Sequence, residues 1–289
     1  MARALIVRMA ESQKQSETPT LLFPDAEEKI KNYPLYFWHV FGKLCSLLLF
    51  GVFTVIFSVI LLPVGRLLFH KKNVFRYKMR YLVHLIFKLH TKFMSVFHVA
   101  KIKTNKPGKL ESLRSAVIVS NHFAYLDPVI LISHLKHATI IPKASLSKKS
   151  IMQLVINTLY MPNSVSYHEM IAQIKQDFAD GNTIVVFPEG TRSSPYGQGV
   201  YKKGAARISL ETGAPIIPIY IGGTGKKGLG KGDKILEYNH TKEIVFDLQI
   251  KDPIYPSEFK DFPYPIATKK LTQKIHDVLS DEANKDYRY

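Results

Sequence analysis

One apolar run, LCSLLLFGVFTVIFSVILLPV over Leu44–Val64, constrains the fold of this chain more than any other feature. As a helix rising 1.5 Å per residue it would be about 30 Å long, which matches the hydrocarbon thickness of a bilayer. The run contains no charged residue, which favours a membrane helix over the buried core helix of a soluble domain. Its glycine, proline and hydroxyl side chains leave a re-entrant or shallowly embedded helix open as an alternative.

The charge of the chain is strongly positive. Lys and Arg total 40 against 23 Asp and Glu, and the net charge of +17 implies a polyanionic partner. No Asp or Glu occurs between Glu28 and Glu111, whereas Lys and Arg are frequent after the apolar run. There, apolar residues of Tyr81–Phe97 recur at three- and four-residue steps, which predicts a basic amphipathic helix on anionic membrane lipids. A nucleic-acid surface would not need the adjoining run, so we expect no nucleic-acid partner.

The same flanking charges predict an orientation. By the positive-inside rule, the chain after the run, including any catalytic domain, lies on the cytoplasmic face of the membrane. The run begins too far from Met1, and lacks the small-residue cleavage site, for a secretory signal. The single cysteine, Cys45, lies inside the run, so we interpret it as a small hydrophobic residue and expect no internal disulfide.

Three regions are expected along the chain. Residues 1–33 form a poorly ordered tail, 34–98 a membrane anchor with the amphipathic helix, and 99–289 a single α/β domain. In the last region strand-like and helix-like segments alternate, which predicts a mostly parallel sheet. The expected strands are Val99–Lys103, Ala116–Ser120, Thr139–Pro142, Thr183–Phe187, Ile216–Ile221 and Ile244–Ile250. The expected helices are Pro128–Leu135, Lys148–Leu159, His168–Ala179, Lys202–Thr212 and Ile266–Leu279.

The first candidate site follows the expected strand Ala116–Ser120. The segment reads NHFAYLDP, with His122 on a turn and Asp127 before a proline as the expected N-cap of a helix. Ligands of α/β sheets bind at such strand ends. A turn can bring Asp127 back to the imidazole, where a carboxylate on one ring nitrogen fixes the tautomer and leaves the other nitrogen to accept a proton. The same His-x4-Asp spacing begins at His276 in the last expected helix, so the spacing also arises by chance.

A second turn ends the expected strand Thr183–Phe187. The segment FPEGTRS, which closes at Ser193, carries one acid, one guanidinium and two hydroxyls. Backbone amides around its glycine and the fork of Arg192 suit a phosphate or another anion. Lys202 and Lys203 then open a helix whose positive N-terminal end would reinforce an anion site. The alternative is a solvated turn whose glutamate and arginine pair with each other.

With these two motifs the chain resembles the glycerolipid acyltransferases, which include the 1-acyl-glycerol-3-phosphate acyltransferases. The matching blocks span Ala116–Ile221 in the family's order: NH-x4-D at Asn121–Asp127, FPEGTRS at Phe187–Ser193, KKGAARIS from Lys202, and Pro-Ile-x-Pro at Pro215–Pro218. The resemblance implies an α/β acyltransferase domain, an acyl-CoA or acyl-ACP thioester as donor, His122 as general base and Asp127 as the residue that orients it. The residues expected to bind substrate are Asn121, Glu189, Gly190, Thr191, Arg192, Ser193, Lys202 and Lys203.

One block of the family's pattern is missing between the two main motifs. The family usually has an acceptor-binding Arg there, after a short apolar strand, but no Lys or Arg occurs from Ser150 to Ile174. A phosphate acceptor would then depend on Arg192, Lys202, Lys203 or Lys143. This leaves open whether the lysophospholipid acceptor is 1-acyl-glycerol-3-phosphate, which would give phosphatidic acid, or whether the acceptor is another lipid or amphiphile.

The sequence also bears on whether the reaction is covalent and on two alternative functions. Neither a Gly-x-Ser-x-Gly elbow nor a suitably placed Cys is present, so we expect no covalent acyl-enzyme, and no metal or cofactor beyond the thioester co-substrate. Gly225–Gly232 nearly spells the phosphate loop of a nucleotide-binding protein, but it ends in Gly where Ser or Thr must bind Mg²⁺. We interpret it as a flexible basic loop near lipid or thioester phosphates. A non-catalytic, membrane-associated scaffold with the same fold is the third alternative.

Overall fold

The computed structural model describes residues 32–142, 152–160, 166–193, 199–226, 228–230, 232–234 and 243–286. The expected tail falls outside these residues except for its last two positions. The apolar run forms part of a longer helical segment made of α2 (Tyr33–Ile56), the π-helical turn η1 (Phe57–Leu61) and α3 (Leu62–Leu68). The segment is long and apolar enough to cross a membrane. The π-helical turn precedes Pro63, which has no N–H to bond to the carbonyl four residues before it.

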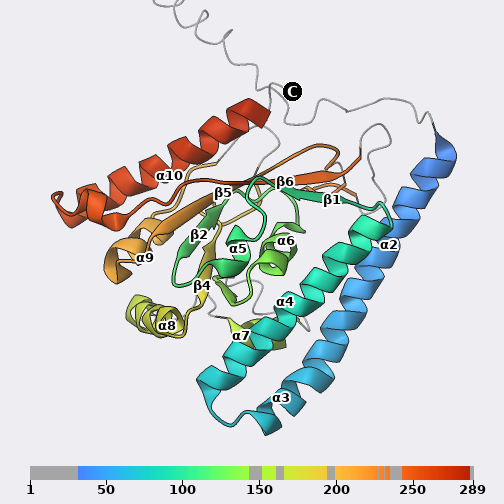
Figure 1. The fold of residues 1–289 in the computed structure, drawn as a ribbon, viewed down its shortest axis with the longest axis horizontal. Helices are drawn as coiled ribbons and strands as arrows, with labels where there is room; N and C mark the ends of the chain where they lie inside the picture. The colour runs from blue at the N-terminus through green and yellow to red at the C-terminus, as the bar shows by residue number, and fades with distance from the viewer. Residues whose placement is uncertain are drawn as a thin grey trace, which may run out of the picture.

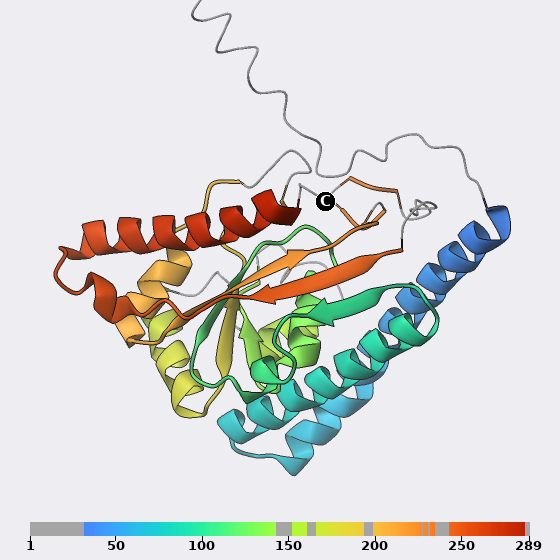
Figure 2. The ribbon, with the colours of Figure 1, turned by 45° about the horizontal axis from the view of Figure 1, so that its top comes forward.

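Helix α4 (Lys72–Val96) runs back beside α2, so the two helices form a hairpin (Figures 1 and 2). The predicted amphipathic helix is confirmed, although it begins earlier than the expected Tyr81. Of the apolar stripe that predicted it, Leu85 and Leu89 are exposed, whereas Leu82 and Ile86 are half-buried against the core that contains Val83. One edge of the apolar side of α4 is therefore available to a membrane, and the other edge packs against the domain.

A six-stranded sheet forms the centre of the domain. Its strands are β1 (Lys101–Thr104), β2 (Val117–Ser120), β3 (Ala138–Ile140), β4 (Thr183–Val186), β5 (Ile216–Gly222) and β6 (Val245–Ile250), in the order β1-β6-β5-β2-β4-β3. All six expected strands are confirmed, with ends that differ by at most two residues. The sheet is mostly parallel, as expected; the exception is the antiparallel pairing of β5 with β6.

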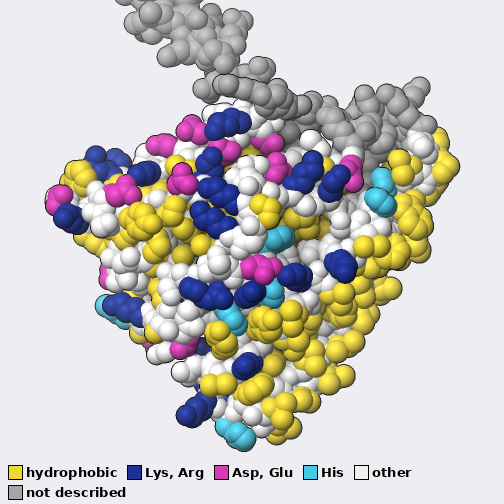
Figure 3. Space-filling view, in the orientation of Figure 1, with side chains coloured by type: hydrophobic (Ala, Val, Ile, Leu, Met, Phe, Trp, Pro, Cys, Tyr) yellow, Lys and Arg dark blue, Asp and Glu magenta, His cyan; other side chains and the backbone are white. Residues whose placement is uncertain are grey.

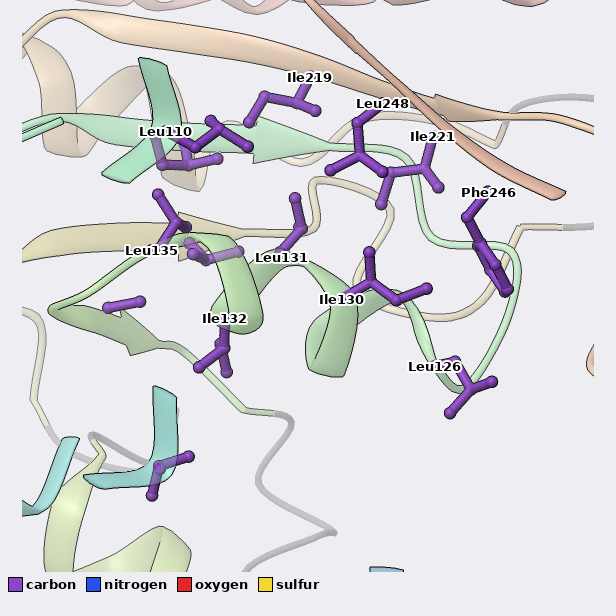
Figure 4. Close-up of a cluster of buried hydrophobic side chains, with 14 of the residues drawn as sticks. Leu110, Leu126, Ile130, Leu131, Ile132, Leu135, Ile219, Ile221, Phe246 and Leu248 are labelled. Atoms are coloured by element: carbon purple, nitrogen blue, oxygen red, sulfur yellow. The ribbon is translucent and has the colours of Figure 1, made fainter. Parts of the chain in front are cut away.

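Helices cover both faces of the sheet. On one face, α4, α5 (Lys109–Ser112), α6 (Asp127–His134) and α7 (Met152–Leu159) contribute to one hydrophobic core. Figure 4 shows Ile130 and Leu131 of α6 close to Ile219 and Ile221 of β5 in this core. On the other face, α8 (Tyr167–Ala179), α9 (Gly204–Thr212) and α10 (Tyr264–Asp286) pack in a second core. The expected helices are confirmed, but the first residues of Lys148–Leu159 lie outside the described part of the chain. The short helix α5 and the 3₁₀ turn Pro256–Phe259 are too short for periodicity to predict.

Candidate active site

The turn between β2 and α6 brings His122 and Asp127 together. Nδ1 of His122 lies 3.1 Å from Oδ2 of Asp127. Asp127 is fully buried. The sequence suggested that it is the N-cap of α6, but it is the first residue of the helix. Its carboxylate instead turns back into the loop, where Oδ2 also accepts a hydrogen bond of 2.7 Å from the Ala124 amide. The carboxylate thus faces Nδ1 and leaves Nε2 as the imidazole nitrogen that can exchange a proton with a substrate.

The second motif closes over the same histidine. Phe187, at the end of β4, stacks on the His122 ring with 4.4 Å between ring centroids. The Ser193 amide donates a hydrogen bond to the His122 carbonyl. Because β2 and β4 are neighbouring parallel strands, their carboxyl ends deliver both turns to one edge of the sheet.

Glu189 stabilises this second turn through hydrogen bonds inside it. It is buried, and its two carboxylate oxygens accept hydrogen bonds from the Ser193 hydroxyl at 2.5 Å and from the Gly199 amide at 3.0 Å. Arg192 instead donates to the Gly230 carbonyl at 2.8 Å. The alternative in which Glu189 and Arg192 pair with each other is therefore wrong. Glu189 and Ser193, both expected to bind substrate, hold the turn in shape in this structure.

Gly190 and Lys202 lie against each other in the turn. Gly190 has a φ of +67°, and a Cβ built on it would lie 2.6 Å from Nζ of Lys202. The Lys202 amide also donates to the Pro188 carbonyl at 2.8 Å. The structure thus brings the ammonium group of Lys202 to the backbone of the motif. Thr191 and Lys203 are both exposed, and Lys203 is the N-cap residue of α9.

Asn121 joins two strands. Its side-chain oxygen accepts a hydrogen bond from the Ile221 amide at 2.7 Å, and its side-chain nitrogen donates to the Ile221 carbonyl at 3.1 Å. With the amide paired on both sides, Asn121 fixes the end of β2 to the end of β5. This contact accounts for the asparagine before His122 more directly than the expected contact with a substrate.

The glycine-rich segment after β5 folds against the site. The Tyr125 amide donates to the Leu229 carbonyl at 3.2 Å, and Asp233 Oδ2 accepts from the amides of Gly228 and Gly230 at 2.7 and 2.8 Å. The described residues of this segment are thus held beside the site by hydrogen bonds. The expected flexibility of Gly225–Gly232 stays a prediction. No helix follows it among the described residues up to 234, which disfavours the nucleotide-binding alternative.

Two lysines that the sequence analysis did not select are buried here. Lys43 of α2 donates to the Gly228 carbonyl at 2.9 Å, and Lys226 donates to the Ile221 carbonyl at 3.2 Å. Only 3% of Lys43 and 2% of Lys226 are exposed. A lysine in a basic segment predicts an exposed charge, so nothing in the sequence indicated that Lys226 is buried. For Lys43, the neighbouring apolar run was the only indication of burial.

A cavity of about 580 Å³ opens beside the histidine. His122, Tyr125 and Arg192 line it together with apolar residues of α2, α4, α6 and α7. Burial raises the pKa of Tyr125 to about 12, although the positive charge of Arg192 opposes this effect. The Tyr125 hydroxyl therefore stays protonated at neutral pH. The arrangement places a proton acceptor with an orienting carboxylate on the wall of a mainly apolar cavity.

The other His-x4-Asp spacing forms no comparable pair. In α10, Nδ1 of His276 lies 3.7 Å from the carboxylate of Asp277, its neighbour in sequence, and 3.3 Å from the Ser280 hydroxyl. His276 offers a natural control for experiments on His122.

Three comparisons relate the chain to known proteins. Residues 101–222 match the family described as Acyltransferase. The chain is 28% identical to a chloroplastic 1-acyl-sn-glycerol-3-phosphate acyltransferase of Brassica napus over 90% of this chain and 72% of the relative. It is 26% identical to the 1-acyl-sn-glycerol-3-phosphate acyltransferase of Salmonella typhimurium over 64% and 77% of the two chains. The crystal structure of the LPA acyltransferase PlsC from Thermotoga maritima has the same fold, with a TM-score of 0.63 at 20% identity over 86% of this chain and 97% of that one.

Proposed function

We propose that this chain, an O-acyltransferase whose residues 101–222 form an Acyltransferase-family domain, transfers a fatty-acyl group from acyl-CoA or acyl-ACP to a lysophospholipid hydroxyl. The proposed acceptor is 1-acyl-glycerol-3-phosphate, and the product is then phosphatidic acid. The names of the relatives from Brassica napus and Salmonella typhimurium support this acceptor. The observation that carries the proposal is the His122–Asp127 pair, whose imidazole lines a mainly apolar cavity.

The reaction follows from the residue types. Nε2 of His122 accepts the proton of the acceptor hydroxyl while the hydroxyl oxygen forms a bond to the thioester carbonyl carbon. Asp127, hydrogen-bonded to Nδ1, stabilises the imidazolium that results. The tetrahedral intermediate then collapses, the C–S bond breaks, and the thiol leaves with the proton that the imidazolium returns. No covalent bond to the protein is needed.

The cavity suits the acyl chain of the thioester. Its lining extends from Lys43 of α2 to Phe57, the first residue of η1, which at 1.5 Å per residue is about 21 Å. One leaflet of membrane hydrocarbon is about 15 Å thick, so the cavity can hold a long fatty-acyl chain. Lys43 marks the end near the active site, because it bonds to Gly228, the neighbour of the Leu229 that contacts Tyr125.

Cations for the acceptor phosphate lie beside the second motif. Arg192 lines the cavity and uses one guanidinium nitrogen for the Gly230 carbonyl, so its remaining N–H groups can bind an anion in a forked geometry. Lys202 lies against Gly190, which precedes Arg192 by two residues in the sequence. These two residues can replace the Arg that the family usually carries between its main motifs. Lys143, the other candidate, lies outside the described residues.

The helical hairpin supports a membrane location. Large apolar side chains are exposed along α2 and α3, such as Leu48 at 70% and Leu67 at 75%. In Figure 3, hydrophobic side chains gather along the edge of the molecule that this hairpin forms in Figure 1. Lys and Arg follow this segment in the sequence. We therefore propose that the hairpin binds an anionic membrane surface and that the domain faces the cytoplasm.

The test uses membranes that contain the full-length chain, an acyl thioester and a series of lyso-lipids. With 1-acyl-glycerol-3-phosphate, His122→Ala should abolish acyl transfer, and Asp127→Asn should lose a large part of the rate without loss of folding. His276→Ala is the matched control and should keep wild-type activity. Near wild-type transfer by His122→Ala would refute the mechanism. Transfer to another lyso-lipid only would replace the proposed acceptor while the chemistry stands, and absence of turnover with every acceptor would favour the scaffold alternative.

A further inference from the structure

A serine and a histidine form a hydrogen-bonded pair between the two long helices of the hairpin. Oγ of Ser46 on α2 lies 3.2 Å from Nε2 of His90 on α4, where the two helices run side by side (Figures 1 and 2). Only 5% of Ser46 and 1% of His90 are exposed, and both residues line the cavity beside His122. A polar pair therefore belongs to a stretch of cavity wall that is otherwise mainly apolar.

The pair differs from the other hydroxyl groups of the helical hairpin. The hydroxyls of Thr54 and Ser58 donate to backbone carbonyls four residues earlier in the same helical segment, at 2.8 and 2.7 Å, so each is satisfied locally. Ser46 instead pairs with a side chain of the other helix. A hydrogen bond between two helices can be purely structural, so the second ring nitrogen decides whether the pair does more.

The second nitrogen of His90, Nδ1, is buried and makes no hydrogen bond within the described part of the chain. Burial lowers the pKa of His90, so the ring is neutral at pH 7 and carries one N–H. If the Ser46 hydroxyl donates to Nε2, Nδ1–H is an unused donor; in the other tautomer, Nδ1 is an unused acceptor. An unmatched polar atom in an apolar wall is costly, and a polar group of a molecule in the cavity would match it.

We propose that His90 is a specificity-determining residue, whose Nδ1 binds an oxygen on the lipid chain that enters the cavity. A hydroxyl matches either tautomer, and a carbonyl oxygen matches the tautomer with Nδ1–H. Along the helix, Ser46 lies about 4.5 Å beyond Lys43, at the active-site end, and about 16 Å before Phe57, at the other end. The oxygen therefore belongs to the head of the lipid chain and not to its tail.

Both substrates of the proposed reaction can carry such an oxygen. A 3-hydroxyacyl thioester has a hydroxyl two carbons from the reacting carbonyl, and 1-acyl-glycerol-3-phosphate has the ester carbonyl of its own acyl chain. The two present the same chemistry to Nδ1. This inference rests on the proposed function, because it takes the cavity to hold the chain of one of these substrates.

The experiment compares matched lipid pairs in the wild-type protein and in His90→Phe, which keeps a ring and removes both nitrogens. The first pair is a saturated acyl thioester and its 3-hydroxy analogue. The second pair is 1-acyl-glycerol-3-phosphate and its 1-alkyl ether analogue, which lacks the carbonyl oxygen.

For each pair, the measured quantity is kcat/KM of the lipid with the additional oxygen divided by kcat/KM of the lipid without it. In the pair that His90 distinguishes, this ratio should fall about fivefold or more in His90→Phe, because the buried oxygen loses its hydrogen-bond partner. The other pair should keep its ratio, which identifies the source of the oxygen.

Two further variants separate recognition from packing. His90→Gln places an amide near the position of Nε2, which keeps the bond to Ser46, and has no polar atom near the position of Nδ1. It should lower the same ratio as His90→Phe does, and it carries the test if His90→Phe fails to fold in a thermal unfolding assay. His168→Phe makes the same substitution at an exposed histidine of α8 and should leave both ratios unchanged.

The outcomes distinguish this inference from the proposed function. Unchanged ratios for both pairs in His90→Phe and His90→Gln would overturn the role of His90, while His122-dependent turnover upholds the proposed function. Absence of turnover with every acceptor would overturn the proposed function.

Binding then tests the role of His90 without turnover. Free 3-hydroxy and unmodified fatty acids, and the ester and ether acceptors without a thioester, compete with a fluorescent fatty acid for the purified full-length chain. In one pair the lipid with the additional oxygen should displace the probe at a lower concentration, and His90→Phe should remove the difference. Equal displacement within both pairs in the wild-type protein would overturn the inference.

Discussion

The cavity beside His122 predicts how the chain selects the length of the acyl group. Helices α2 and α4 run antiparallel, with Ser46 hydrogen-bonded to His90 and Phe50 close to the ring of Phe87. The same register places Val83 level with Thr54, close to the Phe57 end of the cavity and far from the active site. Val83 lines the cavity and is buried. Val83→Phe should therefore fill the cavity about one helical turn short of its end.

The size of the effect follows from the burial of methylene groups. Each methylene that the new ring excludes loses about 0.8 kcal/mol of burial energy, a factor of about four in kcat/KM. If about two methylenes are excluded, a thioester long enough to reach Phe57 should lose about 1.6 kcal/mol, or roughly 15-fold. A shorter chain that ends before Val83 should react as fast as in the wild-type protein. The expected result is a shift of the optimum toward shorter chains.

The assay is kcat/KM for a series of saturated acyl thioesters with one fixed acceptor. Val52→Phe is the matched control, since it makes the same substitution at a site on α2 that is 44% exposed; it should leave the length profile unchanged. Phe57→Ala should shift the optimum in the opposite direction, toward longer chains. An equal loss at all chain lengths in Val83→Phe would show that the ring disturbs the fold, and an unchanged profile would show that the acyl chain does not occupy this cavity.

Three further predictions concern other parts of the molecule. Arg80→Met should lower the free energy of unfolding by about 3–5 kcal/mol, because it leaves the buried Asp177, 2.7 Å from Arg80 NH1, without its counter-charge; Arg80→Met with Asp177→Leu should recover part of the loss in a thermal melt. Gly190→Ala should raise KM for the acceptor more than for the thioester in steady-state kinetics, since its positive φ costs roughly 1–2 kcal/mol in an L-residue and its Cβ would displace Lys202. Leu48→Glu with Leu67→Glu should weaken flotation with anionic vesicles, whereas the same change at exposed Tyr255, outside the hairpin, should not.

Much of this fold can be predicted because its strands are short, apolar and separated by helices. The alternation predicts all six strands, since β2 and β5 are buried on both faces and have few polar residues. The antiparallel pairing of β6 is not predictable in this way. Pairing direction depends on the connection between β5 and β6, and no pattern within either strand encodes it. Helix α4 poses a similar problem, because its apolar stripe predicts the helix without showing which residues of the stripe the domain buries.

In the site too, local contacts can be predicted from the sequence and long-range contacts cannot. The pairing of His122 with Asp127 is local, so a turn between strand and helix suffices to predict it. The partners of Asn121 lie a hundred residues away at Ile221, and the buried Lys226 donates to the same carbonyl. A motif match cannot separate a side chain that binds substrate from one that holds the motif in place. Asn121, Glu189 and Ser193 were all assigned to substrate on that ground, and each is paired with the protein itself.

The arrangement of the sheet explains why these distant pieces meet. Strand β2 lies between β5 and β4 and is parallel to both, so the carboxyl ends of the three strands reach the same edge. Each strand delivers one component there: His122 follows β2, the turn with Arg192 follows β4, and Lys226 follows β5. The central strand carries the proposed base, and its neighbours supply the turn with Arg192 on one side and the buried Lys226 on the other. The site is therefore a product of strand order, which the spacing of motifs along the chain does not contain.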